Sequence, residues 1–238
     1  MNISNTDRIL IVAPHPDDES IGCGGLLSKY GSQCDILVLS DGRKGYRSTD
    51  PVDENELVKI REDELRRAAA IASVNNVRFL KIHDGTVGEN KDIIMQYDIT
   101  PYSLIFVPNR WERHRDHCVV PGLFMKMKRT QHAKARLYEY EVWSPLAAPT
   151  DSIDITEVID TKLQMVAQYE SQTKYVDYCT MALSLSRYRG AGFQSGYAEV
   201  FSYFPYRTCL KKIYDLLPNK VRAVVQHIKQ AVVKRAKE

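Results

Sequence analysis

The 238-residue sequence lacks long hydrophobic runs, paired cysteines and internal repeats. No apolar run approaches the ~18–20 residues that a membrane-spanning helix needs. The polar first eight residues do not resemble a signal peptide. The five cysteines are an odd number and include no C-x-x-C pair, which predicts reduced thiols in a cytoplasmic protein rather than a disulfide framework. The remaining composition, 44% apolar and 26% charged, is that of an ordinary globular protein.

Charge is distributed unevenly along the chain. The net charge is +3, but residues 206–238 carry nine Lys and Arg against two Asp and Glu, so the rest of the chain is net acidic. A nucleic-acid-binding domain spreads its basic residues over a face of the fold, and this distribution therefore argues against nucleic acid as a partner. We predict one globular domain over residues 1–205 and a basic extension over residues 206–238.

The basic extension has the pattern of an amphipathic helix. Apolar residues recur at helical spacing between residues 221 and 232, and lysines and arginines occupy much of the remaining surface. Such a helix either lies peripherally on an anionic membrane or packs on protein, in this chain or in another subunit. The absence of Trp and Phe from the apolar stripe favours packing, whereas a membrane contact would imply a lipid-linked substrate.

Apolar runs alternate with amphipathic stretches in the first half of the sequence. Continuous apolar runs predict buried strands at residues 8–13, 35–39, 77–82 and 103–108. Helical spacing predicts a helix at residues 54–73 and a weaker one at 91–97. This alternation predicts an α/β fold: a mostly parallel sheet with helices on both faces. The C-terminal part is less regular, with strands expected at 137–143 and 200–204 and a helix at 163–170.

Polar side chains follow the first and the fourth predicted strands. His15, Asp17 and Asp18 come directly after the first strand, and His114 and His117 come shortly after the fourth. If the strand order is 3-2-1-4, these two strand ends flank the crevice at which the order reverses, where such folds bind their ligands. The topology therefore predicts that two segments far apart in the sequence form one site.

The composition of this predicted site is typical of metal-assisted hydrolysis. Two imidazoles and a carboxylate around an open position form a catalytic zinc site, in which the pKa of a bound water falls toward ~7. A carboxylate beside that water can serve as general base, and His114 can stabilise an oxyanion or protonate a leaving amine. Asp116 can orient an imidazole. Taken singly, each acidic residue is also explained by the favourable interaction of a carboxylate with a helix N-terminus. A specified five-residue run such as residues 15–19, however, would occur by chance in a chain of this length with odds below about one in ten thousand.

The motifs His15-Pro-Asp-Asp-Glu19 and His114-x-Asp-His117 resemble those of the PIG-L/LmbE family of zinc-dependent N-acetylglucosamine deacetylases. The resemblance extends over most of residues 1–200. Three weaker motifs support it, namely Arg61-x-x-Glu64-x-x-x-Ala68, Tyr169-x-Ser-Gln172 and Tyr197-Ala-Glu-x-Phe201. A Rossmann-like deacetylase domain over residues 1–205 is therefore expected.

The resemblance also implies a set of roles. The family's zinc ligands correspond to His15, Asp18 and His117, and its general base corresponds to Asp17. His114 would polarise the tetrahedral intermediate with Asp116 tuning its imidazole, and Arg61 would bind the substrate. The implied reaction removes the N-acetyl group from an amino sugar of the N-acetylglucosamine type and releases acetate. Zn²⁺ is the expected cofactor, with Fe²⁺ as the alternative, and the sugar's attachment to phosphate, nucleotide or lipid stays open.

Arg61 has a separate argument from its helix. It lies three residues after Val58, on the inward stripe of the predicted helix, where an unpaired charge would be costly. Either it contacts a bound substrate, or it makes a structural pair with Glu64 one turn later.

Two departures from the family pattern concern the substrate. The loop after the second strand contains Arg43 where the family commonly has Glu, and Arg115 replaces a Pro between His114 and Asp116. Both changes add a cation near the expected site, so we hypothesise an anionic group on the substrate.

Two other functions fit parts of the pattern. Two histidines and one carboxylate also form the facial triad of non-haem Fe(II) oxygenases. Such an enzyme needs no general base beside the metal, so Asp17 favours hydrolysis. The second alternative is a carbohydrate-binding protein that has no catalytic turnover. The presence of a suitable residue at every expected catalytic position argues against it.

Overall fold

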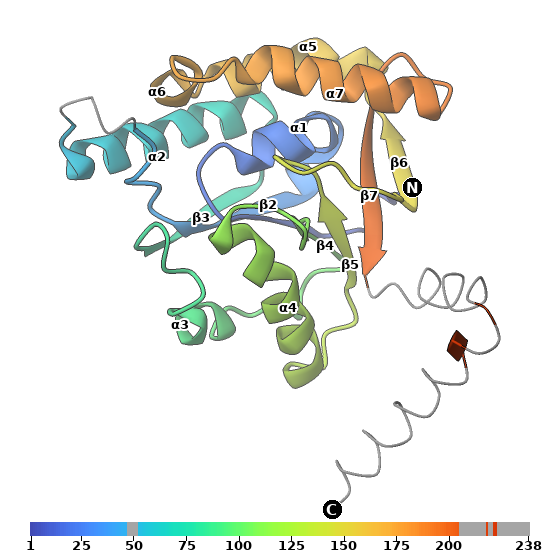
Figure 1. Ribbon diagram of the computed structural model, residues 1–238, viewed down its shortest axis with the longest axis horizontal. Coiled ribbons are helices and arrows are strands. Elements are labelled where there is room, and N and C mark those ends of the chain that lie inside the picture. Colours follow the sequence, from blue (N-terminus) through green and yellow to red (C-terminus); the bar gives the residue numbers. More distant parts are fainter. Residues whose placement is uncertain (47–51, 205–217, 219–220, 223–238) are drawn as a thin grey trace, which may run out of the picture. The chain divides into compact units, whose positions relative to one another are not determined.

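A computed structural model describes residues 1–46, 52–204, 218 and 221–222. Residues 1–204 contain all the strands and helices named below (Figure 1). Apart from Val221 and Arg222, the predicted amphipathic helix lies outside the described residues, and the predicted boundary at residue 205 stays a prediction. Within the described segments, no helix combines the length and low charge that a bilayer crossing requires.

The centre of the domain is a seven-stranded sheet with the strand order β3-β2-β1-β4-β5-β7-β6. Neighbouring strands from β3 to β5 are parallel, and β7 runs antiparallel to both β5 and β6. The strands are β1 (Ile9–Ala13), β2 (Cys34–Ser40), β3 (Asn76–Ile82), β4 (Leu104–Pro108), β5 (Arg136–Tyr140), β6 (Asp151–Asp154) and β7 (Ala198–Phe204). The predictions of a mostly parallel sheet and of the order 3-2-1-4 are confirmed.

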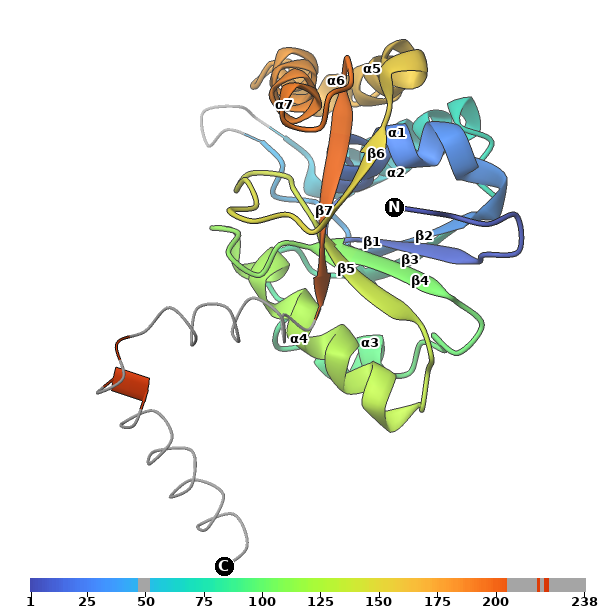
Figure 2. The ribbon, with the colours of Figure 1, turned by 90° about the vertical axis from the view of Figure 1, so that its right-hand side faces the viewer.

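Helices cover both faces of the sheet, as predicted. They are α1 (Asp18–Tyr30), α2 (Glu54–Ile71), α3 (Lys91–Met95), α4 (Arg115–Thr130), α5 (Ile159–Ala167), α6 (Glu170–Thr173) and α7 (Tyr178–Gly192), with short 3₁₀ turns at Gly31–Gln33 and Thr156–Val158. In Figure 2, α3 and α4 lie on one side of the sheet, and α1, α2 and α5–α7 lie on the other.

Strand β1 shows why the sequence requires this layered arrangement. Successive side chains of a strand point to opposite faces. Ile9 and Ile11 therefore pack in the core beneath α1, α2, α5 and α7, whereas Leu10 and Val12 pack against α3 and α4. All five residues of β1 are fully buried. This explains why the run is continuously apolar, whereas a strand with one exposed face would alternate apolar and polar residues.

The C-terminal third differs most from the sequence prediction. The strand expected at residues 137–143 ends at Tyr140, because the carboxylate of Glu112 accepts the backbone N–H groups of residues 142–144 and removes them from the sheet. The helix expected at 163–170 is divided between α5 and α6. Strand β6 and helix α7 carried no sequence prediction.

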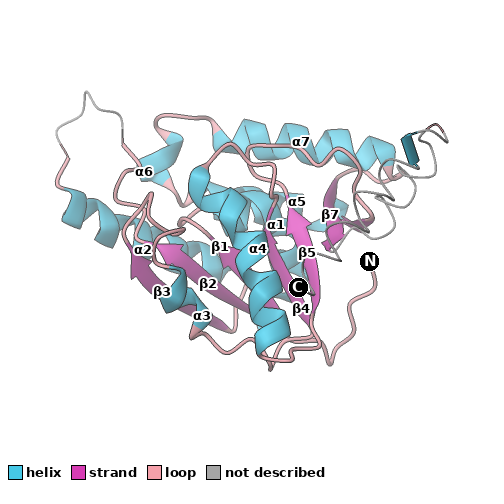
Figure 3. Cartoon of the chain, turned by 60° about the horizontal axis from the view of Figure 1, so that its bottom comes forward, coloured by secondary structure: helices cyan, strands magenta, loops and turns pink. Residues whose placement is uncertain are grey.

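The parallel strands end along a common edge of the sheet. Figure 3 shows the arrowheads of β1–β3 pointing to the same side of the domain. The loops after β1, β3 and β4 leave this edge and lead into the next elements along the chain. Because β1 and β4 are neighbours in the sheet but not in sequence, their two loops diverge around a crevice.

Candidate metal centre

Three loops at the carboxyl edge of the sheet bring the polar residues together. The loop after β1 carries His15 and leads into α1, which begins at Asp18. The loop after β4 leads to His114, the N-cap of α4, and to His117 in the first turn of that helix. The loop after β3 carries Asp84. The meeting of the first and fourth strand ends is the arrangement that the sequence predicted.

His15, Asp18 and His117 converge through one atom each. His15 Nδ1 lies 3.1 Å from His117 Nε2, and Asp18 Oδ2 lies 3.3 Å from the first nitrogen and 3.2 Å from the second. All three residues are buried. The other ring nitrogen of His117, Nδ1, has no hydrogen-bond partner within the described chain.

The dimensions of this triangle fit a metal ion. Ligand atoms about 2.0–2.1 Å from a tetrahedral zinc ion are about 3.3–3.4 Å apart, close to the three measured separations. A single proton links only two atoms, whereas a cation satisfies three converging lone pairs at once. Two other groups also have suitable spacing, and both include His15: one adds His114 and His117, the other adds Asp84 and Asp116.

The second nitrogen of the His15 ring faces two carboxylates. Its Nε2 lies 3.2 Å from Asp84 Oδ1 and 3.5 Å from Asp116 Oδ2. Burial opposes protonation of His15, but hydrogen bonds to Asp116, Asp18 and Asp84 outweigh burial and raise its pKa well above 6.5. The resemblance implied that Asp116 tunes the imidazole of His114. The charge of Asp116 does act to raise the pKa of His114, while its carboxylate accepts the Gly85 N–H at 2.7 Å and faces His15.

His114 presents its ring at the edge of this cluster. Its Nδ1 accepts the backbone N–H of Asp116 at 3.3 Å, so in the neutral imidazole the proton resides on Nε2. Partial burial, together with neighbouring His15 and His117, lowers the pKa of His114 below 6.5. The ring is therefore a neutral N–H donor near pH 7.

Asp17 sits beside the triangle in a strained conformation. Its backbone has φ 132° and ψ −31°, a region that residues other than glycine rarely adopt. The Asp17 N–H donates to Glu19 Oε2 at 3.2 Å, and Glu19 in turn accepts hydrogen bonds from the Ser20 and Tyr169 hydroxyls. This buried network holds the turn that directs Asp17 away from its neighbour Asp18.

The carboxylate of Asp17 contacts the Arg61 guanidinium. Arg61 Nη2 donates to Asp17 Oδ2 at 2.9 Å and to the carbonyl oxygen of Pro16. Burial raises the pKa of Asp17, Arg61 lowers it and Asp18 raises it, with the net result a pKa of about 8. For Asp18, burial alone would raise the pKa, but His117 and His15 hold it well below its usual range.

Arg61 is on the buried side of α2, as its helical position predicted. Its side chain is 3% exposed, and Nη1 donates to the Gly42 carbonyl at 2.8 Å. Gly42 has φ +64°, and a Cβ there would lie 2.7 Å from Arg61 Nη1, so glycine is required for this contact. The alternative pair with Glu64 is not formed, because Glu64 accepts the Ser171 N–H and hydroxyl, both at 2.7 Å.

A cleft of about 220 Å³ opens beside these groups. Its lining includes His15, Asp17, Asp18, Arg61 and His114, together with four residues for which the sequence suggested no specific role, Lys44, Trp143, Gln172 and Tyr178.

The two cations behind the anionic-substrate hypothesis are occupied elsewhere. Arg43 contacts Asp41 at 2.8 Å, and Arg115 contacts Glu89 at 2.7 Å. Neither lines the cleft. The charges of Arg43 and Arg115 are therefore paired outside the cleft, whereas Lys44 lines it, and the anionic group on the substrate stays a prediction.

Asp84 is the site residue that sequence reasoning missed. His83-Asp84-Gly85 had the pattern of a turn, and the chain does turn there. Its position after β3 placed it on the same sheet edge as His15, and that was the available signal. Trp143 and Tyr178 come from the less regular part of the chain, where no strand or helix could be placed well enough to indicate their direction.

Comparisons with known proteins agree with this geometry. A family model described as PIG-L, GlcNAc-PI de-N-acetylase, matches residues 10–128. The chain is 27% identical to a diacetylchitobiose deacetylase of Thermococcus kodakarensis, over 71% of each chain. It is 28% identical to a probable N-acetyl-alpha-D-glucosaminyl L-malate deacetylase 2 of Bacillus subtilis, over 71% of this chain and 84% of the relative.

A solved structure shares the fold. The conserved protein TT1542 from Thermus thermophilus superposes with a TM-score of 0.72 and 26% identity, covering 83% of this chain and 94% of that one.

Proposed function

Because this chain belongs to the PIG-L family of de-N-acetylases, we propose that it hydrolyses the N-acetyl group of an N-acetylated amino sugar with one zinc ion and releases acetate. The observation that carries the proposal is the triangle of His15, Asp18 and His117 with Asp17 beside it but outside it. The relatives that act on diacetylchitobiose and on N-acetylglucosaminyl malate support an amino sugar of the N-acetylglucosamine type.

Three residues of the triangle would hold the ion. His15 Nδ1, His117 Nε2 and Asp18 Oδ2 are three protein ligands, and three ligands with a fourth position free are typical of catalytic zinc. Zinc supplies a Lewis acid for the amide oxygen and a water of lowered pKa. The carboxylates of Asp84 and Asp116 would fix the His15 ring through Nε2, as partners of metal-bound histidines commonly do.

Asp17 would take the proton from the attacking water. A base is most effective when its pKa lies near the working pH, and burial moves the pKa of this carboxyl from 3.8 toward neutrality. Arg61 keeps the carboxylate in place through its 2.9 Å contact. After attack, the proton held by Asp17 would pass to the departing amine, because the amide C–N bond breaks only when its nitrogen is protonated.

His114 and Arg61 would contact the substrate. The Nε2–H of His114 is a neutral donor at the cleft, suited to the oxygen on which negative charge develops as the carbonyl is attacked. Arg61 also lines the cleft, where its guanidinium could meet a substrate oxygen beside Asp17.

An Fe(II) oxygenase would use the same three ligands, and the metal's identity is part of this proposal. The buried carboxyl of Asp17, with its raised pKa, favours hydrolysis because oxygen activation needs no general base there. Oxygen consumption without acetate release would favour the oxygenase.

Acetate release from free, nucleotide-linked and lipid-linked N-acetylhexosamines tests the proposal. The full chain would be assayed after zinc loading, after chelation, and as the Asp17→Asn variant. We expect zinc-dependent acetate release that Asp17→Asn nearly abolishes, while Asp63→Asn, an exposed carboxylate on α2, behaves as wild type. Absence of acetate from every zinc-loaded assay, or equal activity in the Asp17→Asn variant, would contradict it.

A further inference from the structure

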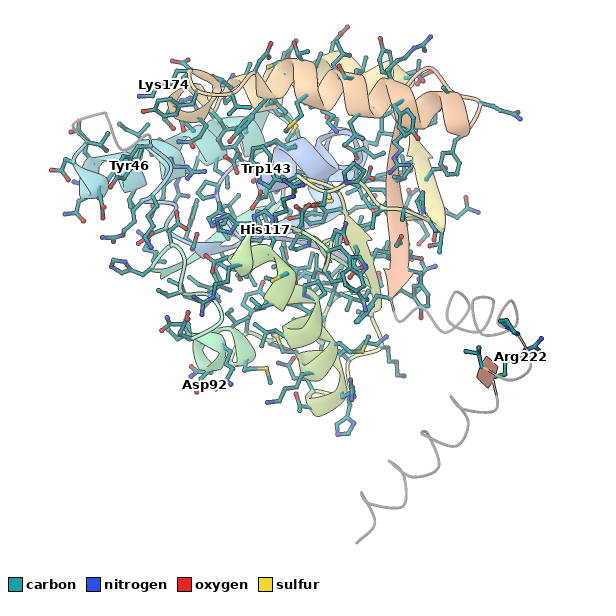
Figure 4. All side chains as sticks on the ribbon, in the orientation of Figure 1. Tyr46, Asp92, His117, Trp143, Lys174 and Arg222 are labelled. Carbon is teal, nitrogen blue, oxygen red and sulfur yellow. The ribbon has the colours of Figure 1, made fainter. Side chains whose placement is uncertain are left out.

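Two aromatic side chains form one side of the cleft. Trp143 lies in the loop between β5 and β6, and Tyr178 is the first residue of α7. Both line the cleft together with His15, Asp17 and His114. Figure 4 labels Trp143 and, at the start of α4, His117. The aromatic pair therefore borders the reaction centre although it comes from the other half of the chain.

The two rings differ in exposure, and each supports the other. Tyr178 is 6% exposed, whereas Trp143 is 42% exposed. Their centroids are 5.6 Å apart at an interplanar angle of 68°, the edge-to-face geometry that aromatic pairs favour. The buried tyrosine thus backs the tryptophan, whose remaining indole surface is open to a ligand.

The backbone that carries Trp143 is firmly held. Glu112 Oε1 accepts the N–H groups of Val142, Trp143 and Ser144 at 3.1, 3.0 and 3.1 Å. Within the same loop, the Glu141 carboxylate accepts the Leu146 N–H. A large apolar side chain that stays exposed on an anchored loop is pre-organised for binding, because little conformational freedom is lost when a ligand covers it.

The chemistry of the cleft indicates what covers the indole. The rest of the lining is mostly charged or polar and includes Lys44 and Gln172. A ligand that presents hydroxyl groups at its edges and C–H groups on one face matches a polar cleft with one aromatic side. The negative face of an indole attracts such C–H groups. A volume of about 220 Å³ is below the ~300–1,000 Å³ of pockets that enclose drug-sized ligands, so it suits a single sugar ring.

We infer that Trp143, backed by Tyr178, is the platform on which the apolar face of the N-acetylated pyranose ring packs. This inference rests on the proposed function and adds its specificity: the ring that carries the acetamido group is recognised inside the cleft, and whatever is attached to it remains outside. Acyclic N-acetyl amines would lack this contact.

Steady-state kinetics with N-acetylglucosamine tests the platform directly. In Trp143→Ala we expect KM to rise about tenfold, while kcat stays within about twofold of the wild-type value. A loss of affinity of this size is expected when the sugar no longer covers part of an indole ring. Trp143→Phe should recover most of the affinity. Trp111→Ala is the matched control, because Trp111 is the protein's other tryptophan, is 74% exposed and is absent from the cleft lining. For N-acetylethanolamine, an acyclic amide, Trp143→Ala should leave KM unchanged.

Fluorescence gives a readout that does not require turnover. Trp111→Phe leaves Trp143 as the single tryptophan, and Trp143→Phe leaves Trp111. In zinc-loaded protein that also carries Asp17→Asn, N-acetylglucosamine should change the emission of the Trp143-only chain saturably and leave the Trp111-only chain unaffected.

The two measurements separate the platform from the reaction. The platform is overturned if acetate is released and KM is unchanged in Trp143→Ala. It is also overturned if acetate is released and both single-tryptophan chains show equal emission changes. In either case the deacetylase proposal stands. A saturable response confined to Trp143 supports the platform even if no acetate is released.

Discussion

Two clusters of buried charge contact helix α1, and they are built in opposite ways. Midway along the helix, Lys162 Nζ contacts Glu199 Oε1 at 2.7 Å, and Glu199 also accepts the N–H groups of Gly25 and Leu26. Each carboxylate oxygen has a donor and the two charges cancel. This cluster is complete in itself.

The cluster at the N-terminus of α1 is not balanced. Five buried carboxyl groups gather there, those of Asp17, Asp18, Glu19, Asp84 and Asp116. The cations that contact them within the described chain are Arg61 and, when protonated, His15 and His117. An excess of buried negative charge is costly unless a cation compensates it. The contrast indicates that a self-satisfied charge pair maintains the fold, whereas an uncompensated cluster marks the place for an ion.

Removing the charge of Asp17 should produce the largest functional effect. In Asp17→Asn we expect kcat to fall by about 10³-fold, equivalent to about 4 kcal/mol, because general-base catalysis contributes on this scale. The free energy of unfolding should not fall near pH 7, since the buried Asp17 carboxyl, with its pKa raised to about 8, is already largely protonated in the chelated chain and the amide is equally uncharged. Acetate-release kinetics and chemical denaturation check both parts, and a large loss of stability would contradict the contrast.

Breaking the Lys162–Glu199 pair should have the reverse pattern. Lys162→Met leaves Glu199 buried without its charged partner, so we expect the free energy of unfolding to fall by about 3 kcal/mol. The folded fraction should keep its kcat, because neither residue lines the cleft. The double variant Lys162→Met/Glu199→Gln should recover more than half of the loss, and an unchanged denaturation midpoint in the single variant would show that the pair is not structural.

The carboxylate of Asp84 should have an intermediate effect. Asp84→Asn weakens the support of the His15 ring at Nε2, and loss of such a partner commonly costs 10–100-fold in metal affinity. Competition with a chelator measures the change, and Asp63→Asn serves as the control. Equal zinc affinity in the two variants would exclude a supporting role for Asp84.

Asp84 also shows where prediction from sequence ended. The apolar runs were sufficient for β1 to β4, and the order of those strands placed the His15 and His114 segments at one crevice. The direction of the Asp84 side chain depends on a 3.2 Å contact across the sheet edge, which no local pattern contains. For Asp116, the sequence suggested its neighbour His114, but the Asp116 N–H occupies that imidazole while its carboxylate turns to Gly85.

The early end of β5 has a similar long-range cause. Residues 137–143 read as one strand, yet Glu112 from the loop after β4 captures the N–H groups of residues 142–144. Only the folded chain brings this carboxylate to β5. The same contact positions Trp143, so the part of the sequence that was hardest to interpret contains the residue that we infer to bind the sugar ring.

The smallest expected effect that distinguishes the two clusters is the pH dependence of the free energy of unfolding. In chelated protein, burial raises the pKa of Asp17 from 3.8 to about 8, so the folded state binds a proton that the unfolded chain has released. The associated stability is complete below pH 3.8 and is lost as the pH rises through 8, at no more than ~1.4 kcal/mol per pH unit. The raised pKa of His15 also lowers the free energy of unfolding as the pH rises above 6.5.

Denaturant unfolding of the chelated chain between about pH 5 and pH 8 measures this slope. Asp17→Asn should flatten it, because the variant lacks the titrating carboxyl group. Lys162→Met/Glu199→Gln should retain it, because this variant keeps the Asp17 carboxyl group and the His15 ring. Zinc should also reduce the slope, since a divalent ion favours the ionised carboxylate and takes the place of the proton on His15. An identical slope in wild type and Asp17→Asn would mean that the charge imbalance at the start of α1 is relieved by groups other than Asp17.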